Sequence, residues 1–348
     1  MTPRDIFKAE AAKRILITDG AFGTEIQNWK LDEAAYAGTL GLGHDQKGNN
    51  DILALTMPEV PESIHRAYFE AGADIAETNT FSANRISQAD YGADNLVREI
   101  NIASAHLARK LADEFQAKDG RPRFVAGALG PTNKTLSLSP DVNDPGYREI
   151  DFDYLKDVYR EQIDALVEGG VDFILIETVF DTLNAKAGVM AAIEAADDLG
   201  HDLPIMLSMT LTDLSGRNLS GHTVEAFWHA IRHARPLTIG LNCSFGAEQL
   251  RPHVKVLSEI CDTLIMVYPN AGLPNELGEY DEAPATTAGL VGEWAGAGQV
   301  NVLGGCCGST PAHIKAIADG VANVAPRVVP TPPVRTRLAG LEPMTMAA

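Results

Sequence analysis

The chain has 348 residues, which suffices for one large barrel with extensions or for two domains. Its formal net charge of −19 at pH 7 opposes nucleic-acid binding, because nucleic-acid phosphates would be repelled, and no apolar run is long enough to span a bilayer. Four cysteines in so long a chain do not form a disulfide framework, and residues 1–10 do not resemble a signal peptide, so we expect a cytoplasmic protein.

Short apolar segments alternate with helix-like stretches along the whole chain. The predicted strands cover residues 15–19, 73–78, 123–129, 171–178, 204–210, 237–243, 263–269 and 300–305. The predicted helices cover residues 63–71, 96–115, 154–168, 182–198, 224–234, 248–260, 287–295 and 311–321. Eight successive units predict an α/β fold, a single-domain (β/α)8 TIM barrel. An open doubly wound sheet is the alternative, but no Gly-x-Gly-x-x-Gly follows a strand and opens a helix.

Two segments lie outside this alternation. Residues 28–51 form a long, glycine-rich insert after the first strand, and residues 327–348 form a proline-rich linker or tail. We therefore expect the barrel domain to cover residues 1–326.

Polar residues and cysteines gather at the carboxyl ends of the predicted strands, where barrels of this kind place their chemistry. In chain order these ends contain Asp19, Glu77 to Thr80, Gly130 to Thr132, Glu177 and Thr178, Thr210, Asn242 and Cys243, Asn270, and Cys306 and Cys307. A closed barrel brings all of them around one cavity.

The cysteines carry the most specific signal. Cys306 and Cys307 are neighbours in the segment GGCCG, and both sulfurs can reach one point only if the backbone bends sharply, which glycines permit. Cys243 at another strand end would complete a three-sulfur zinc site with one open position. A vicinal disulfide or a redox dithiol is the alternative for the pair, although it leaves Cys243 unexplained. Cys261 lies in a helical pattern and is expected to be unrelated.

Each remaining candidate also has a plain structural interpretation. Asp19 precedes a glycine and can simply form a turn. Glu177 ends a very apolar run, where a carboxylate needs either a structural partner or a cationic ligand, and we favour the functional interpretation. Asn79 and Asn270 are equally consistent with loop hydrogen bonding.

Seven segments resemble the homocysteine S-methyltransferase family, and most closely the homocysteine-binding domain of cobalamin-dependent methionine synthase. They are TDGAFGT (18–24), ETNTF (77–81), GALGPT (127–132), ETVFDT (177–182), GLNCS (240–244), YPNAG (268–272) and GGCCGS (304–309). The resemblance covers roughly residues 13 to 341. The PNAG segment, residues 49–51 and residues 217–221 resemble the cobalamin-dependent branch in particular.

This resemblance implies a (β/α)8 barrel with a catalytic Zn²⁺ and with homocysteine as the methyl acceptor. The implied site residues are the zinc ligands Cys243, Cys306 and Cys307, the exchangeable fourth ligand Asn270, and the homocysteine contacts Asp19, Gly23, Thr24, Asn79, Glu177 and Asn242. Among these, Asp19 and Glu177 are candidate anions for the substrate ammonium. The backbone amides of Gly23 and Thr24 are candidate donors to its carboxylate.

The methyl donor is the least determined part of this interpretation. Cobalamin-dependent methionine synthases usually continue into folate-binding, cobalamin-binding and reactivation domains. This sequence stops soon after LAGLEP (338–343), which resembles the bridge to the folate domain. We therefore expect a methyl-acceptor half, either a naturally separate subunit or a truncated form, that receives the methyl group from methylcobalamin on a separate folate- and cobalamin-binding methionine synthase subunit.

Zinc coordination would acidify the homocysteine thiol, which is mostly protonated at neutral pH when free. One alternative function is a stand-alone homocysteine methyltransferase with a small sulfonium or betaine donor, which an aromatic-lined pocket would mark. Another is a non-enzymatic zinc-binding or redox-sensing protein.

Overall fold

The computed structural model describes residues 1–346 and confirms the predicted barrel. Its parallel strands are β1 (Leu16–Ile17), β2 (Ile75–Glu77), β3 (Phe124–Leu129), β4 (Phe173–Val179), β5 (Ile205–Met209), β6 (Thr238–Gly246), β7 (Leu264–Asn270) and β8 (Val302–Leu303). They pair in the order β1-β8-β7-β6-β5-β4-β3-β2, and a single bridge between Thr18 and Ile75 closes the ring.

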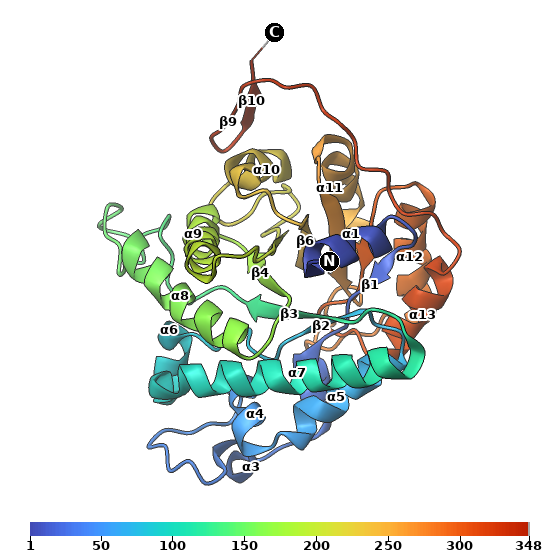
Figure 1. Ribbon diagram of the computed structural model, residues 1–348. Coiled ribbons are helices and arrows are strands. Elements are labelled where there is room, and N and C mark those ends of the chain that lie inside the picture. The colour runs from blue at the N-terminus through green and yellow to red at the C-terminus, as the bar shows by residue number, and fades with distance from the viewer. Residues whose placement is uncertain (347–348) are drawn as a thin grey trace.

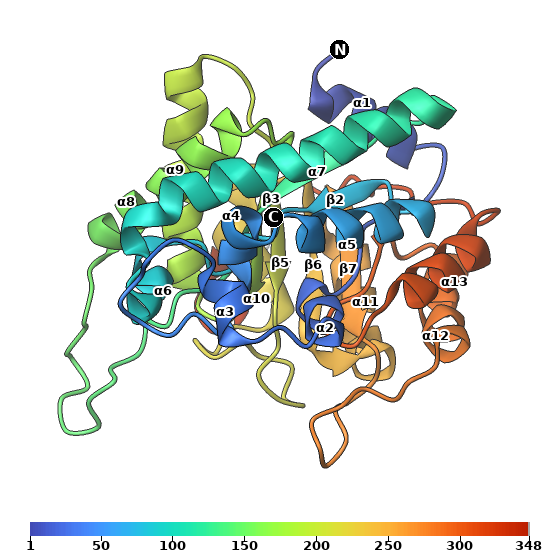
Figure 2. The same ribbon diagram turned by 90° about the horizontal axis from the view of Figure 1, so that it is seen from below.

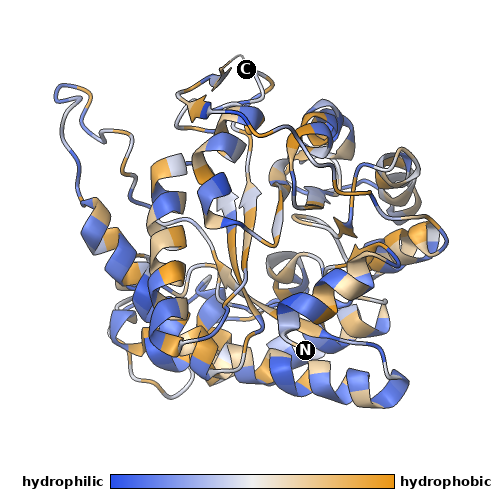
Figure 3. Cartoon of the chain, turned by 45° about the horizontal axis from the view of Figure 1, so that its top comes forward, coloured by the Kyte–Doolittle hydropathy of each residue, from blue (hydrophilic) through white to orange (hydrophobic). Residues whose placement is uncertain are grey.

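Helices cover the outside of this ring of strands (Figure 1). The helices of the eight predicted units are α5 (Glu59–Glu70), α7 (Val97–Asp119), α8 (Phe152–Glu168), α9 (Thr182–Leu199), α10 (Val224–Ile231), α11 (Ala247–Ile260), α12 (Pro284–Gly296) and α13 (Pro311–Val321). They carry apolar and polar residues on different faces (Figure 3), and the apolar faces pack on the sheet. Among residues 1–346, no helix combines the length and apolar character needed to cross a membrane.

A helix that the sequence analysis did not predict, α1 (Pro3–Ala11), closes one end of the barrel. It begins at a capping box formed by Thr2 and Asp5. Its fully buried Phe7 packs against Phe124 and Phe173, the first residues of β3 and β4, with each ring centroid 5.2 Å away. Figure 2 shows α1 at the end of the barrel opposite to α2 (Phe22–Asn28) and α3 (Glu33–Ala37). The carboxyl ends of the strands are therefore the open end.

The insert after β1 is held against the loop after β2 by side-chain amides. Asn49 and Gln88 exchange two hydrogen bonds, of 2.9 and 3.0 Å, and Asn49 also donates to Gln46 at 3.1 Å. All three side chains are fully buried, so each amide needs the others as partners. This network fixes Asn50 and Asp51 at the open end of the barrel.

The chain beyond residue 326 runs along the barrel and ends in a short antiparallel hairpin, β9 (Arg337–Ala339) and β10 (Pro343–Thr345), beside α10 (Figure 1). The backbone amide of Thr223 donates to the carbonyl of Leu341 at 3.2 Å, and Arg217 forms an ion pair with Glu342. The division of the chain into a barrel and a linker at residue 326 stays a prediction.

Candidate active site

One cavity of about 660 Å³ opens at the carboxyl ends of the strands, as the position of polar residues in the sequence suggested. Of the predicted site residues, those that line it are Gly23, Thr24, Asn79, Glu177, Cys243, Cys306 and Cys307. Asp19, Asn242 and Asn270 are buried behind this lining. Within the described chain, no lysine or arginine lines this cavity, whereas several carboxylates do.

The three cysteines of β6 and the β8 loop converge on one point. Cys243 Sγ lies 3.9 Å from Cys307 Sγ, and the three sulfurs all lie within 4.8 Å of one another. Three sulfurs bound to one zinc at about 2.3 Å would be about 3.8 Å apart in tetrahedral geometry. The spacing therefore fits a shared metal. A disulfide would instead need a separation of about 2.0 Å, and all four cysteines are free.

An irregular backbone turns Cys243 toward this point. Cys243 and Ser244 both adopt left-handed conformations, with φ of 61° and 60°, which non-glycine residues rarely do. The pairing of β6 with β7 shifts register between Asn242 and Gly246. Such local strain typically persists only where the surrounding structure holds it, and it is common at functional sites.

The loop after β8 bends because its glycines leave room. A Cβ atom at Gly304 would collide with Thr18 on the neighbouring strand, and Gly308 has a φ of 78°. The amide of Cys306 donates to Pro269 at 2.7 Å, and the amide of Ala271 donates to the carbonyl of Cys307 at 2.9 Å. The end of β7 thus holds the cysteine pair.

The same loop is bonded on its other side to the start of α2. The carbonyl of Ser309 accepts hydrogen bonds from the amide of Ala21 at 3.2 Å and from the hydroxyl of Tyr68 at 3.0 Å. The amide of Gly308 donates to Thr24 Oγ1 at 3.0 Å. The cysteine loop and the segment that contains Gly23 and Thr24 therefore form one bonded unit.

Asn242 lies beneath the cysteines and holds their surroundings. Its Oδ1 accepts hydrogen bonds from Ser208 Oγ at 2.6 Å and from the amide of Thr178 at 3.1 Å. Its Nδ2 donates to Thr178 Oγ1 at 2.8 Å and to Cys306 Sγ at 3.8 Å. Because the carbonyl oxygen of Asn242 already accepts two hydrogen bonds, the orientation of the amide is fixed, with one N–H group directed to Thr178 and the other to the Cys306 sulfur.

Carboxyl groups gather beside the cysteines. Glu77 and Glu177 line the cavity, and Tyr268 donates to Glu177 Oε2 at 3.2 Å. Asp19 lies one layer deeper, where its Oδ2 accepts the backbone amide of Glu77 at 3.0 Å. Thr18 Oγ1 lies 3.3 Å from Asp19 Oδ1 and 3.4 Å from Glu77 Oε1, which links the two acids.

Burial shifts the protonation of these acids. Burial raises the pKa of Glu177 to about 7, and burial together with the nearby Glu177 carboxylate raises the pKa of Glu77 well above its usual range. Burial likewise raises the pKa of Asp19 well above its usual range. A cluster of this kind retains protons or takes up a cationic ligand, because several buried carboxylates cannot all ionise side by side.

The thiols of the cysteine cluster shift one another's pKa in opposite directions. Hydrogen bonds from Cys243 and Cys306 lower the pKa of Cys307 to about 3, whereas the hydrogen bond with Cys243 raises that of Cys306 well above its usual range. The cluster thus accepts one negative charge readily and resists further charge. A bound metal cation is the natural compensation for full ionisation.

Comparison with known proteins identifies the family. The sequence profile described as homocysteine S-methyltransferase matches residues 16–321, most of the chain. The chain belongs to the homocysteine S-methyltransferase family. It is therefore a methyltransferase, as the resemblance of its motifs implied.

Solved structures agree on the fold. The metallated form of the homocysteine methyltransferase MmuM from Escherichia coli is 22% identical, with a TM-score of 0.70, and the match covers 90% of this chain and 98% of that one. The oxidised form of the same protein is 22% identical, with a TM-score of 0.71, over 92% of this chain and 99% of that one.

The structure adds one acid and two hydroxyl groups to the predicted site residues. Glu77 was seen at a strand end, but only the structure places it in the lining of the cavity while Asp19 lies behind it. Tyr268 and Ser208 are not among the predicted site residues, although each forms a hydrogen bond with one of them. Asn79 donates to the carbonyl of Asn50 at 2.8 Å and so holds the insert at the rim of the cavity.

Asn270 ends β7 with an unsatisfied oxygen. The residue is 1% exposed, and its Oδ1 has no hydrogen-bond partner among the described residues. A buried amide oxygen without a partner is destabilising unless something else contacts it. Its backbone neighbours are the segments that hold the cysteines, since Pro269 and Ala271 bond to Cys306 and Cys307.

Proposed function

We propose that this chain transfers a methyl group to the sulfur of homocysteine at a zinc ion held by Cys243, Cys306 and Cys307. The observation that carries the proposal is the adjacency of two unlike sites in one cavity. Three sulfurs at metal-sharing distance lie beside a cluster of carboxyl groups, and no basic residue among the described residues lines this cavity. A thiol compound with an ammonium group matches both.

The residues present fit zinc. Three thiolates are a donor set that zinc favours, and three protein ligands leave a fourth position for a substrate. The unpartnered Oδ1 of Asn270 supports its assignment as the exchangeable fourth ligand. When bound, zinc supplies a Lewis acid that lowers the pKa of the homocysteine thiol, so that the sulfur is nucleophilic at neutral pH.

The remaining residues bind and orient the substrate. We assign the ammonium to Glu77 and Glu177, with Tyr268 holding the Glu177 carboxylate in place and Asp19 fixing the backbone of Glu77. The backbone amides of Gly23 and Thr24 are assigned to the substrate carboxylate. Binding of the ammonium would favour the ionised form of both glutamates, because an adjacent cation lowers a carboxyl pKa.

Asn79 in the cavity lining and Asn242 behind it complete the site. Asn79 lines the cavity and holds the insert, so we retain it as a substrate contact. Asn242 donates to Cys306, and we assign it to positioning that sulfur. In the transfer, the substrate sulfur forms a bond to the methyl carbon, and the electron pair of the breaking bond stays with the leaving group.

For the donor we propose methylcobalamin carried by a separate folate- and cobalamin-binding methionine synthase subunit. The resemblance of the PNAG segment, residues 49–51 and residues 217–221 to the cobalamin-dependent branch supports this choice. The half-exposed Phe81 at the cavity gives an apolar contact for a large partner-borne group. Free thiols at the site suit a reducing compartment, so we propose a cytoplasmic location.

One observation favours a second donor. Five aromatic residues line the cavity, namely Phe22, Phe81, Tyr91, Phe180 and Tyr268. Asp51 lines it too, buried and without an ion-pair partner in the described chain. Aromatic faces and an unpaired carboxylate are what recognise a small methylated cation, such as a sulfonium or a betaine. In that case the chain would work without a corrinoid.

Donor assays separate these functions. Purified protein with bound zinc is supplied with homocysteine and, in separate reactions, methylcobalamin, methyltetrahydrofolate, a methylsulfonium compound or a betaine, and methionine is measured. We expect methionine with methylcobalamin only. Turnover with the sulfonium or the betaine alone would establish the second donor, and no methionine from any donor in a protein that binds zinc would favour a non-enzymatic zinc or redox-sensing role.

A further inference from the structure

A second cavity, of about 740 Å³, lies at the opposite end of the barrel from the active site, beside α1. Six basic side chains from three separate parts of the sequence line it: Arg4 and Lys8 of α1, Arg232 and Arg235 after α10, and Arg335 and Arg337 before and in β9. One carboxylate, Asp262, lines it with them. Such a gathering is unexpected on a chain with 47 acidic and 28 basic residues.

Several of these charges are not compensated. Arg4 pairs with Asp202 and Arg232 pairs with Asp262, each at 2.5 Å. The guanidinium of Arg337 donates only to backbone carbonyls. The side chains of Lys8, Arg235 and Arg335 form no ion pair within residues 1–346. At least three positive charges therefore line one cavity without an ion-pair partner among the described residues, and bringing them together is unfavourable unless a ligand offsets their repulsion.

The backbone conformation of Arg235 also supports a ligand site at this cavity. Arg235 follows the short 3₁₀ helix η4 (Arg232–Ala234) and has a φ of 47° and a ψ of 53°, the left-handed conformation that favours glycine or asparagine. An arginine at this position is disfavoured locally by about 1–2 kcal/mol. Arg235 is exposed, lines the cavity and forms no ion pair within residues 1–346, so no contact with a charged group of the described chain offsets this cost.

A buried histidine at the same cavity lacks a partner. The side chain of His229 in α10 is 2% exposed, lines the cavity, and has no hydrogen bond at either ring nitrogen. The Glu225 carboxylate lies 3.6 Å away, beyond hydrogen-bond distance. A ligand oxygen that reached the inner end of the cavity would accept the ring N–H. This second observation is independent of the count of charges.

We propose that this cavity binds a small molecule that carries a diphosphate or triphosphate group. Three to four uncompensated cations match the charge of such a group, whereas a monocarboxylate would offset only one. Arginine side chains bind phosphate oxygens in pairs, and five of the six basic residues that line the cavity are arginines. Three of these, Arg235, Arg335 and Arg337, form no ion pair within residues 1–346. The volume lies in the range of ordinary small-molecule sites.

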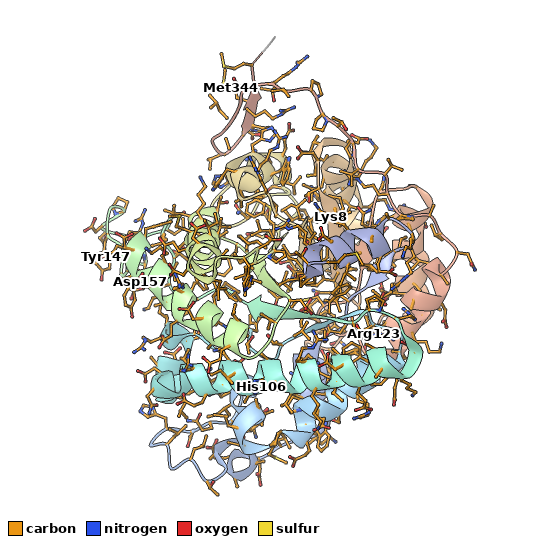
Figure 4. The ribbon with its side chains drawn as sticks, viewed as in Figure 1. Lys8, His106, Arg123, Tyr147, Asp157 and Met344 are labelled. Atoms are coloured by element: carbon orange, nitrogen blue, oxygen red, sulfur yellow. The ribbon has the colours of Figure 1, made fainter. Side chains whose placement is uncertain are left out.

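Binding there would join parts of the chain that are far apart in the sequence. Lys8 lies on α1 over the end of the barrel (Figure 4), Arg235 follows α10, and Arg335 precedes the hairpin. A polyphosphate held among them fastens the segment after residue 326 to the barrel. The site is remote from the cysteines, so its occupancy affects the position of the chain terminus rather than the chemistry of methyl transfer.

Calorimetric titration of the whole chain with inorganic triphosphate tests the proposal. Arg235→Gly removes one lining charge and also relieves the left-handed strain, so its fold is not threatened. Lys30→Gly is the matched control, because Lys30 is also an exposed cation with a left-handed backbone, with a φ of 51°, and it does not line this cavity. We expect saturable binding that weakens with added salt and that Arg235→Gly reduces about five- to tenfold, as one charge pair in a largely aqueous setting predicts.

Arg335→Ala should give a similar loss, and the double variant with Arg235→Gly a larger one. Titration with adenosine triphosphate distinguishes a nucleotide from a free polyphosphate as the ligand. Tighter binding of adenosine triphosphate than of inorganic triphosphate would show that the nucleoside also contacts the cavity. Absence of saturable triphosphate binding, or equal weakening by Lys30→Gly, would overturn the site. Tighter binding of a hexaglutamate peptide than of either phosphate compound would also overturn it, in favour of an acidic protein partner.

Discussion

Asp51 tests whether ionisation of a buried carboxyl group at the open end of the barrel lowers the stability of the protein. The residue is buried in the insert, accepts the amide of Ser82 at 3.3 Å and has no ion-pair partner in the described chain. Burial raises its pKa from 3.8 to about 7. A difference of about 3 pKa units corresponds to about 4 kcal/mol of unfolding free energy, at 1.36 kcal/mol for each unit.

The direction of the pH dependence follows from the pH range in which the native protein, but not the unfolded chain, keeps the Asp51 proton. The native protein keeps the Asp51 proton up to about pH 7, and the unfolded chain releases it near 3.8. The contribution to stability is therefore complete below pH 3.8, falls as the pH rises, and is lost above 7. Asp51→Asn removes this dependence, since the neutral amide can still accept the Ser82 amide. We expect the variant to equal the wild type near pH 4 and to exceed it by up to about 4 kcal/mol at pH 8.

This difference is measured by urea unfolding of both proteins between pH 4 and 8.5, after the same treatment with a metal chelator. The other buried acids titrate in both proteins, so subtraction isolates Asp51. A difference that does not change with pH would refute the reasoning. So would a variant that is less stable at pH 8, because the ionised carboxylate would then be stabilised by contacts that the structure does not contain.

Four further outcomes are expected. Cys243→Ala should lose zinc and activity, whereas Cys261→Ala, a change in the packed core, should keep both in metal analysis; full zinc in the former contradicts the centre. X-ray absorption should detect three sulfurs and one light ligand without homocysteine and four sulfurs with it, and Asn270→Ala should exchange the light ligand for water without changing the sulfur count. Glu177→Gln should weaken homocysteine binding by roughly 3–5 kcal/mol in calorimetry and retain zinc, and normal affinity in this variant would show that Glu177 has a structural role. Because burial raises the pKa of Glu177 to about 7, the affinity of the wild type for homocysteine should rise as the pH increases through 7. Phe7→Ala should lower the unfolding free energy by about 3–5 kcal/mol with metal content unchanged; an unaltered urea midpoint would show that α1 is not part of the core.

The sequence was sufficient to predict the barrel, because each strand is a short apolar run with a polar end. Glu177 illustrates the rule: it follows a fully apolar run in which Phe173 and Leu175 pack in the barrel interior while Ile174 and Ile176 pack against the helices, and it lines the cavity. The cysteines were also predictable as a group, since adjacent Cys306 and Cys307 among glycines need a sharp bend. Both inferences use local patterns and one topological rule.

Finer placement was not predictable from such patterns. Whether Asp19 or Glu77 faces the cavity depends on the stagger between neighbouring strands, and the register shift after Asn242 depends on contacts with β7. Helix α1 carries no strand-to-helix signal, so its role in closing the barrel through Phe7 was not foreseen. These features result from long-range packing, which a single sequence does not encode in any local segment.

The loop after β8 has a consequence for linkage between ligands. One edge of it carries Cys306 and Cys307, and its other edge is bonded through Gly308 and Ser309 to the segment proposed for the substrate carboxylate. A ligand that orders either edge reduces the entropy that the other ligand must still lose. By thermodynamic reciprocity, an amino acid with no thiol at all should tighten zinc binding, and zinc should tighten the binding of that amino acid by the same factor.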